Sequence, residues 1–145
     1  MIADSKLMDH MPMLKNKVLH VTDKKIYLFE RYGINFTGMF VYSNETIDAS
    51  LCESHIRKSD SCTVFDNNLL FITYDVVDIE DSIKAAQNLL LFYQEKYHLQ
   101  ELYMVVSPAY QEETAMDMGS SLVRLLDYAI KESLKNKVIC MPDMA

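Results

Sequence analysis

The segment Ser61–Val77, SCTVFDNNLLFITYDVV, decides the fold. Its two ends, Ser61–Phe65 and Leu69–Val77, are rich in β-branched and aromatic residues and predict strands. Asp66-Asn67-Asn68 stands between them, and Asn and Asp tolerate positive φ better than most residues that carry a side chain. The segment is therefore predicted to be a β-hairpin whose turn contains no glycine.

The residues before the hairpin predict a helix, a strand and a short helix. Apolar positions recur at helical spacing from Leu14 to Tyr32, and Gly33 suits the left-handed position that ends many helices. Phe36–Tyr42 is apolar on both faces, as expected of a buried central strand. A short helix is expected at about Ile47–Ile56.

The residues after the hairpin predict two longer helices, each followed by a strand. Asp78 is expected to cap a helix whose apolar stripe occupies Ile79–Tyr97. A strand at Leu102–Val106, a helix at about Thr114–Lys135 and a short strand at Val138–Met141 follow. The whole order contains β-α-β-β-α-β, the arrangement of ferredoxin-like domains. The predicted fold class is an α/β (α+β) sandwich with helices flanking an antiparallel-rich central sheet.

Composition indicates one globular domain. The chain has 145 residues, half of them hydrophobic, which is enough for a single core. It contains only three glycines and three prolines, which argues against linkers and disorder. The glycines are also too far apart for a Gly-rich phosphate-binding loop. We therefore expect one domain over residues 1–145, with residues 1–10 as a ragged lead-in.

Charge limits the classes of partner. With 14 Lys and Arg against 21 Asp and Glu, the formal net charge is -7, which disfavours nucleic acid and anionic membrane surfaces. No apolar run approaches the length of a membrane span, and no signal-peptide pattern is present. The three cysteines do not form a disulfide framework, so a cytoplasmic location is expected.

Four short stretches, met in order along the chain, carry a family resemblance. They are residues 9–17 with Asp9, Leu14 and Asn16 in place, Arg31-Tyr32-Gly33, Arg57-Lys58-Ser59-Asp60, and Leu122–Ile130. Together, over about Asp9–Met141, they resemble the GGDEF domain, the diguanylate cyclase fold of bacterial signalling. The resemblance implies the same fold as the pattern of predicted helices and strands.

The departures from the family pattern concern its catalytic residues. Counted from Asp60, the five positions of the G-G-D-E-F signature fall on Asp66, Asn67, Asn68, Leu69 and Leu70, and none is kept. In the family, the paired glycines let the hairpin approach the nucleotide, and the acids that follow serve metal binding and catalysis. The family's other metal-binding acid aligns here with Tyr42 or Asn44.

These departures predict a domain that is not an enzyme. Cyclisation of GTP needs hard cations held by carboxylates, which neutralise the triphosphate and activate the attacking hydroxyl. We expect no catalytic residue, no metal site and no cofactor in this chain, and a regulatory role in signalling instead.

The resemblance also implies a candidate ligand site at Arg57 and Asp60. In the family this R-x-x-D motif binds cyclic di-GMP, because a guanidinium can bind phosphate or guanine and a carboxylate can accept from the guanine edge. The alternative is structural: Arg57 ends a helix near its negative pole, and Asp60 caps the turn before the next strand.

Two further groups of residues have mainly structural interpretations. Cys52 and His55 have C-x-x-H spacing, but no complementary pair of metal ligands is present elsewhere. Phe92, Tyr93, Tyr97 and Tyr103 are expected to be core residues with polar tips. If they were exposed, they would favour a protein partner. The alternative function is thus a ligand-free interaction module that forms a homodimer or binds a signalling protein.

Overall fold

We describe the chain from a computed structural model, which defines residues 1–109 and 116–140. The strands are β1 (Phe36–Tyr42), β2 (Ser61–Asp66), β3 (Leu69–Asp75), β4 (Tyr103–Pro108) and β5 (Val138–Cys140). The helices are α1 (Met11–Tyr32), α2 (Ala49–Glu53), α3 (Ile79–Lys96) and α5 (Met118–Lys131), preceded by two 3-10 turns, η1 (Asp4–Lys6) and η2 (Met8–His10).

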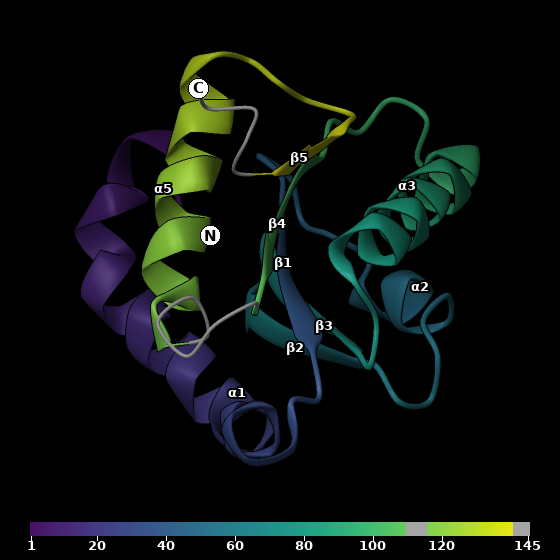
Figure 1. The fold of residues 1–145 in the computed structure, drawn as a ribbon. Helices are drawn as coiled ribbons and strands as arrows, with labels where there is room; N and C mark the ends of the chain where they lie inside the picture. The colour runs from purple at the N-terminus through teal and green to yellow at the C-terminus, as the bar shows by residue number, and fades with distance from the viewer. Residues whose placement is uncertain (110–115, 141–145) are drawn as a thin grey trace.

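Within the described residues the five strands form one sheet in the order β2-β3-β1-β4-β5. Neighbouring strands are antiparallel except β4 and β5, which are parallel. Figure 1 shows α1 and α5 on one face of the sheet and α2 and α3 on the other. The predicted α/β sandwich with an antiparallel-rich sheet is confirmed.

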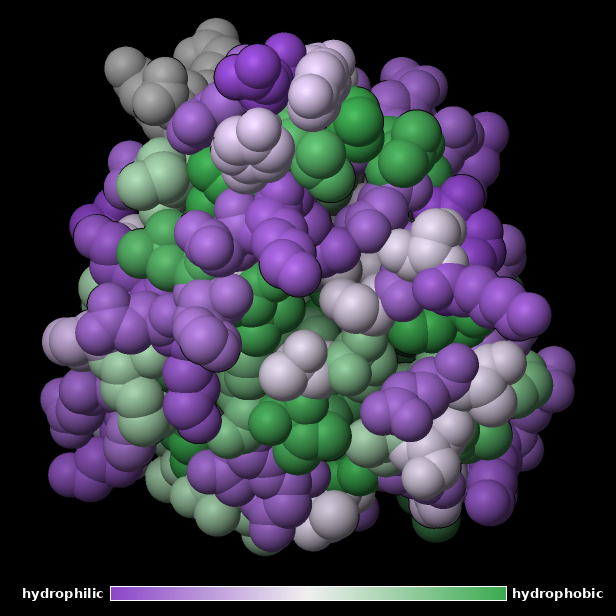
Figure 2. Space-filling model, turned by 90° about the horizontal axis from the view of Figure 1, so that it is seen from below, coloured by the Kyte–Doolittle hydropathy of each residue, from purple (hydrophilic) through white to green (hydrophobic). Residues whose placement is uncertain are grey.

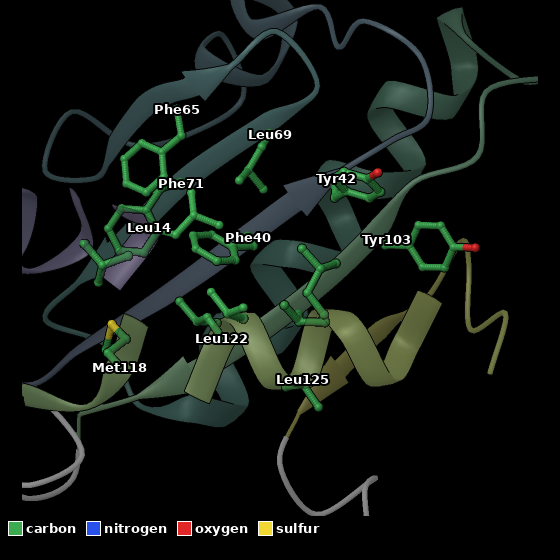
Figure 3. Close-up of a cluster of buried hydrophobic side chains, with 14 of the residues drawn as sticks. Leu14, Phe40, Tyr42, Phe65, Leu69, Phe71, Tyr103, Met118, Leu122 and Leu125 are labelled. Carbon is green, nitrogen blue, oxygen red and sulfur yellow. The ribbon is translucent and has the colours of Figure 1, made fainter. Parts of the chain in front are cut away.

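The two faces of the sheet bury two separate hydrophobic clusters. The cluster under α1 and α5 contains Phe40, Phe65 and Phe71, whose ring centroids lie 5.4–6.0 Å apart. Figure 3 shows that side chains from β1, β2, β3 and α5 meet in this cluster. The cluster under α2 and α3 includes Tyr93, which is fully buried. Since every residue of β1 is buried, this strand lies at the centre of the molecule, as its two-sided apolar pattern predicts.

The predicted helix ends have specific caps. Gly33 follows α1 with φ +66°, and its N–H donates to the carbonyl of Phe29, so glycine meets the need for a left-handed residue here. Asp78 caps α3 as predicted, because its carboxylate accepts from the N–H of Asp81 at 2.8 Å. Asp48 caps α2 in the same way through the N–H of Leu51.

Some predicted boundaries differ from the structure. The short helix expected at Ile47–Ile56 covers only Ala49–Glu53, because Asp48 caps it and the N–H of Ile47 donates instead to the carbonyl of Asn67. The helix expected from Thr114 is described from Met118 onward. Residues 110–115 and 141–145 lie outside the described residues. They include Thr114, the predicted start of this helix, and Met141, the predicted end of the last strand.

The N-terminal segment, residues 1–10, is packed against the sheet and is not the ragged lead-in that its polar composition predicts. Ile2 is 3% exposed and Leu7 is fully buried, and both belong to the cluster under α1 and α5. The segment turns twice as η1 and η2 before α1 begins. Its two buried apolar side chains therefore extend the core beyond the predicted elements.

Seen from below, the molecule has hydrophobic surface in the middle of this end, bordered by hydrophilic residues (Figure 2). Exposed apolar residues lie where α1 ends and in the turn after β3: they are Leu28, Tyr32, Ile34 and Val76. No helix within the described residues is long and apolar enough to cross a membrane.

Candidate functional site

The hairpin turn between β2 and β3 and the start of β3 hold residues 66–70, the five positions that the family resemblance aligns with the G-G-D-E-F signature. Asp66 ends β2, Asn67 is exposed, and Asn68 is 1% exposed. Leu69 and Leu70 begin β3, are fully buried and point into the two opposite hydrophobic clusters. Two of the five positions therefore belong to the core, where an ionised carboxylate would be costly.

The turn forms without a left-handed residue. Neither Asn67 nor Asn68 has positive φ, so the reason given for this hairpin from the sequence is wrong even though the hairpin itself is confirmed. A register shift between Val64 and Asp66 marks a bulge just before the turn. Asn68 contributes to this turn through the hydrogen bonds of its side chain and not through its backbone conformation.

The Asn68 side chain makes three buried hydrogen bonds. Its Oδ1 accepts from the N–H of Ile2 at 2.9 Å. Its Nδ2 donates to the carbonyl of Ile2 at 2.8 Å and to the carbonyl of Ser43 at 2.9 Å. Asn68 thus joins the hairpin turn, the N-terminal segment and the end of β1.

Tyr42, the last residue of β1, holds the same segment from the other side. Its hydroxyl lies within hydrogen-bond distance of two acceptors, the Ile2 carbonyl at 2.8 Å and Asp4 Oδ1 at 2.6 Å. Burial, and then the neighbouring Asp4 carboxylate, raise the pKa of Tyr42 far above its usual value, so the hydroxyl stays protonated. Tyr42 is therefore a hydrogen-bond donor at this position and not a ligand for a cation.

The surface beside these contacts is an open hollow of about 450 Å³. It is lined by the first five residues together with Asn44 and Asn68. Within the described part of the chain, no group of three or more His, Cys, Asp or Glu side chains is placed to hold a metal ion. The side chains around this hollow offer neutral amide and hydroxyl groups and the single carboxylate of Asp4.

Arg57 and Asp60 lie together at the other end of the hairpin. Arg57 Nε donates to Asp60 Oδ2 at 3.1 Å, and Arg57 Nη2 donates to Asp60 Oδ1 at 2.9 Å. The same Nη2 donates to the carbonyl of Asp75, at the end of β3. The Asp60 carboxylate also accepts from the backbone N–H groups of Arg57 and Asp75. The sequence predicts these two residues as a pair, and the structure brings them into direct contact.

The two partners differ in exposure. The Asp60 side chain is 2% exposed and the Arg57 side chain is 55% exposed. Burial works to raise the pKa of Asp60, but the hydrogen bonds from Arg57 and from the two backbone amides outweigh it and hold the pKa below its usual value. Asp60 is therefore a buried, ionised carboxylate with four donors around it, and Arg57 covers it from the solvent side.

Similarity to known proteins is found at the level of structure. No protein-family model and no curated protein matches the sequence. A microbial GGDEF domain, studied for its interaction with bis-(3′,5′)-cyclic di-GMP, superposes with a TM-score of 0.68 at 10% identity, over 88% of this chain and 92% of that chain. The chain has the fold of a GGDEF domain.

Two further solved structures are similar in the same way. The GGDEF domain of TpbB (YfiN) from Pseudomonas aeruginosa gives a TM-score of 0.59 at 10% identity and covers 81% of this chain and 83% of that chain. The diguanylate cyclase SiaD of P. aeruginosa, solved in complex with its activator SiaC, gives 0.57 at 9% identity, over 88% of this chain and 58% of that chain.

The GGDEF-like fold places the two candidate regions at opposite ends of one hairpin. The signature positions lie at the turn, beside the N-terminal segment, and Arg57 and Asp60 lie where the hairpin begins. Sequence reasoning missed Ile2 and Asp4 as contributors to the first region. The signal in the sequence was two branched apolar residues, Ile2 and Leu7, in a segment that also carries Asp4, Lys6 and Asp9.

The remaining candidates are structural. Cys52 is 1% exposed, and burial raises the pKa of its thiol to about 12. The ring of His55 stacks on Phe92 with centroids 4.2 Å apart. Tyr93 is buried, as expected of a core residue, and its hydroxyl donates to Gln100 at 2.8 Å.

Proposed function

We propose that this chain is a catalytically inactive, GGDEF-like regulatory domain in bacterial signalling, and that its output is contact with a protein partner. The observation that carries the proposal is the buried Asn68 amide. Two of its three hydrogen bonds attach the N-terminal segment to the hairpin turn and the third goes to Ser43, at a position where the family resemblance implies a catalytic acid.

The chemistry of the neighbouring positions supports loss of catalysis. Phosphoryl transfer from GTP needs divalent cations bound by carboxylates, and this region presents Asn68, Leu69 and Tyr42 instead. Leu69 is fully buried and has no ligating atom, and the Tyr42 hydroxyl already donates to the Ile2 backbone. Asp4 alone cannot hold two divalent cations against a triphosphate.

Turnover of GTP tests this half of the proposal. We expect the purified chain to make no cyclic di-GMP from GTP with Mg²⁺ or Mn²⁺, under conditions in which an active diguanylate cyclase does so. Metal-dependent formation of cyclic di-GMP by the wild-type chain would contradict the proposal.

A second candidate function, binding of cyclic di-GMP through Arg57 and Asp60, is favoured by one observation. Arg57 is half-exposed, its Nη1 group donates to nothing within the described residues, and the exposed apolar side chain of Val76 follows its acceptor Asp75. A free pair of N–H groups beside apolar surface suits a phosphate and a purine ring.

The Asp60 carboxylate argues against this second function. Each of its oxygens already accepts two N–H groups, so binding a guanine edge would require Asp60 to exchange bonds made within the protein. This is why we place a protein partner first and a nucleotide second.

Calorimetric titration with cyclic di-GMP separates the two functions. Under the proposal, the wild type gives no binding heat at high micromolar ligand. Binding that Arg57→Ala abolishes and Lys58→Ala retains would establish the second function in place of the first. Lys58 is a matched control, because it adjoins Arg57 and makes no ion pair within the residues described.

A further inference from the structure

A groove runs between α1 and the edge strand β2. It has a volume of about 620 Å³ and is lined by Met13, Lys17, His20 and Val21 from the helix and by Thr63, Val64 and Phe65 from the strand, with Asn16 at its side. Two contacts hold the helix against the hairpin: Lys17 Nζ donates to the carbonyl of Phe65 in β2, and Lys25 Nζ pairs with Asp75 at the end of β3. The groove therefore lies beside residues 63–65 of β2.

One side of the groove is an unpaired strand edge. β2 pairs with β3 alone and is the first strand of the sheet order within the described residues. An edge strand leaves backbone N–H and C=O groups of alternate residues without sheet partners, and these can bind an added strand. Val64, which is 53% exposed, offers an apolar contact on this strand.

The other side of the groove belongs to a helix whose formal charge is positive, in contrast to the rest of the chain, and Lys17 is the charged residue of the groove lining. α1 carries five Lys and Arg residues against two Asp and Glu residues, a net of +3, whereas the whole chain has a net of -7. The remainder thus has a net of -10. Met13, Lys17 and His20 line the groove at helical spacing, and Lys24, the next residue at that spacing, lines the adjoining hollow together with Asp23 and Lys25.

We propose that the groove between α1 and β2 binds an extended, acidic segment of a partner protein, which adds to β2 as a further strand. Backbone hydrogen bonds would come from β2, apolar contacts from Val64 and Val21, and charge complementarity from Lys17 in the groove and Lys24 beside it. The inference rests on the proposed function only in placing the partner of a non-catalytic domain on this surface.

Charge disfavours the other occupants of the groove. A second copy paired through β2 about a twofold axis perpendicular to the sheet would bring two basic α1 helices to the same face. Nucleic acid would meet a chain whose remaining net charge is strongly negative. An acidic peptide with alternating apolar residues brings no second α1 helix, and because only every second residue is charged, the negative remainder of the chain repels it less than it repels nucleic acid.

Two synthetic peptides of eight residues test the proposal on the full chain. One alternates Glu with Val and the other alternates Lys with Val, and both carry a fluorescent label for anisotropy titrations. We expect the acidic peptide to bind about tenfold or more tightly than the basic one. Its binding should weaken with added salt. Equal affinity for the two peptides, or no binding of either, would overturn the proposal.

Charge reversal locates the binding surface. Lys24→Glu should weaken binding of the acidic peptide by about three- to tenfold. Lys84→Glu, an exposed position on α3, makes the same change of net charge and should leave the affinity unchanged. In the same way Val64→Glu should weaken binding, and Leu99→Glu, at a site 86% exposed, should not. Equal effects within either pair would overturn the proposal.

Hydrogen exchange provides a readout of strand addition itself. The acidic peptide should slow exchange of β2 amides in Ser61–Asp66 and leave the β5 amides unchanged. Binding without protection of β2, or self-association of the chain that the peptide displaces, would overturn the proposal. Turnover of GTP would contradict the proposed function alone, because the peptide experiments test the groove independently of catalysis.

Discussion

At the scale of single residues, Asn68 has a role that its neighbour Asn67 does not share. Asn68 is buried with three hydrogen bonds, whereas Asn67 is exposed and only its backbone is engaged. We predict that Asn68→Ala lowers the free energy of unfolding by about 2–3 kcal/mol, because buried backbone groups of Ile2 and Ser43 lose a partner. Urea denaturation measures this value.

The matched variant Asn67→Ala should change the free energy of unfolding by less than about 0.5 kcal/mol. Equal effects of the two substitutions would show that the turn as a whole, and not the buried amide of Asn68, stabilises this end of the hairpin.

Val76 is a residue in an unfavourable backbone conformation. Its φ is +57°, which is rare for a β-branched residue, and its side chain is 71% exposed. Its N–H donates to the carbonyl of Asn35 and so fixes the turn after β3. We predict that Val76→Asn raises the free energy of unfolding by about 1 kcal/mol, because Asn tolerates left-handed φ and little packing is lost.

The control for this prediction is Val64→Asn, a substitution at another exposed valine, which lies in a strand without positive φ. It should be neutral or slightly destabilising, because Asn is disfavoured in strands. Thermal unfolding gives the midpoint of each variant. A lower midpoint for Val76→Asn than for Val64→Asn would contradict the argument from φ.

At the scale of elements, the Arg57–Asp60 pair fastens the start of β2 to the end of β3. Asp60 precedes β2, and its carboxylate accepts the N–H of Asp75, while Arg57 donates to the carbonyl of the same residue. Because the pKa of Asp60 is depressed in the folded state, its ionisation contributes stability that is present above its unfolded pKa. That contribution is lost as pH falls through the folded pKa.

This linkage predicts the pH dependence of Asp60→Asn. The variant should be less stable than wild type by about 1–3 kcal/mol at pH 7, because hydrogen bonds to a charged group are lost. The deficit should shrink as pH falls from about 5 to about 2, since wild-type Asp60 is then protonated too. A deficit independent of pH would contradict the argument.

The elements that could be predicted from the sequence are those whose signal is local. β1 has its predicted bounds because seven consecutive buried residues need apolar side chains on both faces. Gly33 and Asp78 mark helix ends because their local geometry decides the cap. Of the site, the sequence singles out Arg57 and Asp60 as one motif, and the structure adds that these residues, three apart in a turn, contact each other.

The features that could not be predicted depend on residues far apart in the chain. Asn68 and Ile2 are separated by 66 positions, and nothing near either residue indicates their hydrogen bonds. Gly119 lies in α5 against α1, where an added Cβ would be 2.9 Å from the Cα of Lys15. Close approach of two helices is a property of their packing and leaves no periodic signal.

At the scale of the whole molecule, the N-terminal segment joins parts that the sheet alone would leave apart. Ile2 contacts the β1 end through Tyr42 and the hairpin turn through Asn68. Leu7 belongs to the same hydrophobic cluster as residues of α1, α5 and the sheet. The segment therefore closes one end of the core that lies between the sheet and the two helices α1 and α5.

Leu7→Ala tests whether this closure stabilises the whole fold. Leu7 is fully buried in the native state. Its truncation should lower the free energy of unfolding by about 2–5 kcal/mol, because apolar burial is lost and a cavity is left behind. Met8, its neighbour, is 42% exposed, and Met8→Ala should change the free energy of unfolding by less than about 0.5 kcal/mol. Denaturant unfolding with one cooperative transition would show that the loss is global. A small effect of Leu7→Ala, matching that of Met8→Ala, would mean that the core is complete without the N-terminal segment.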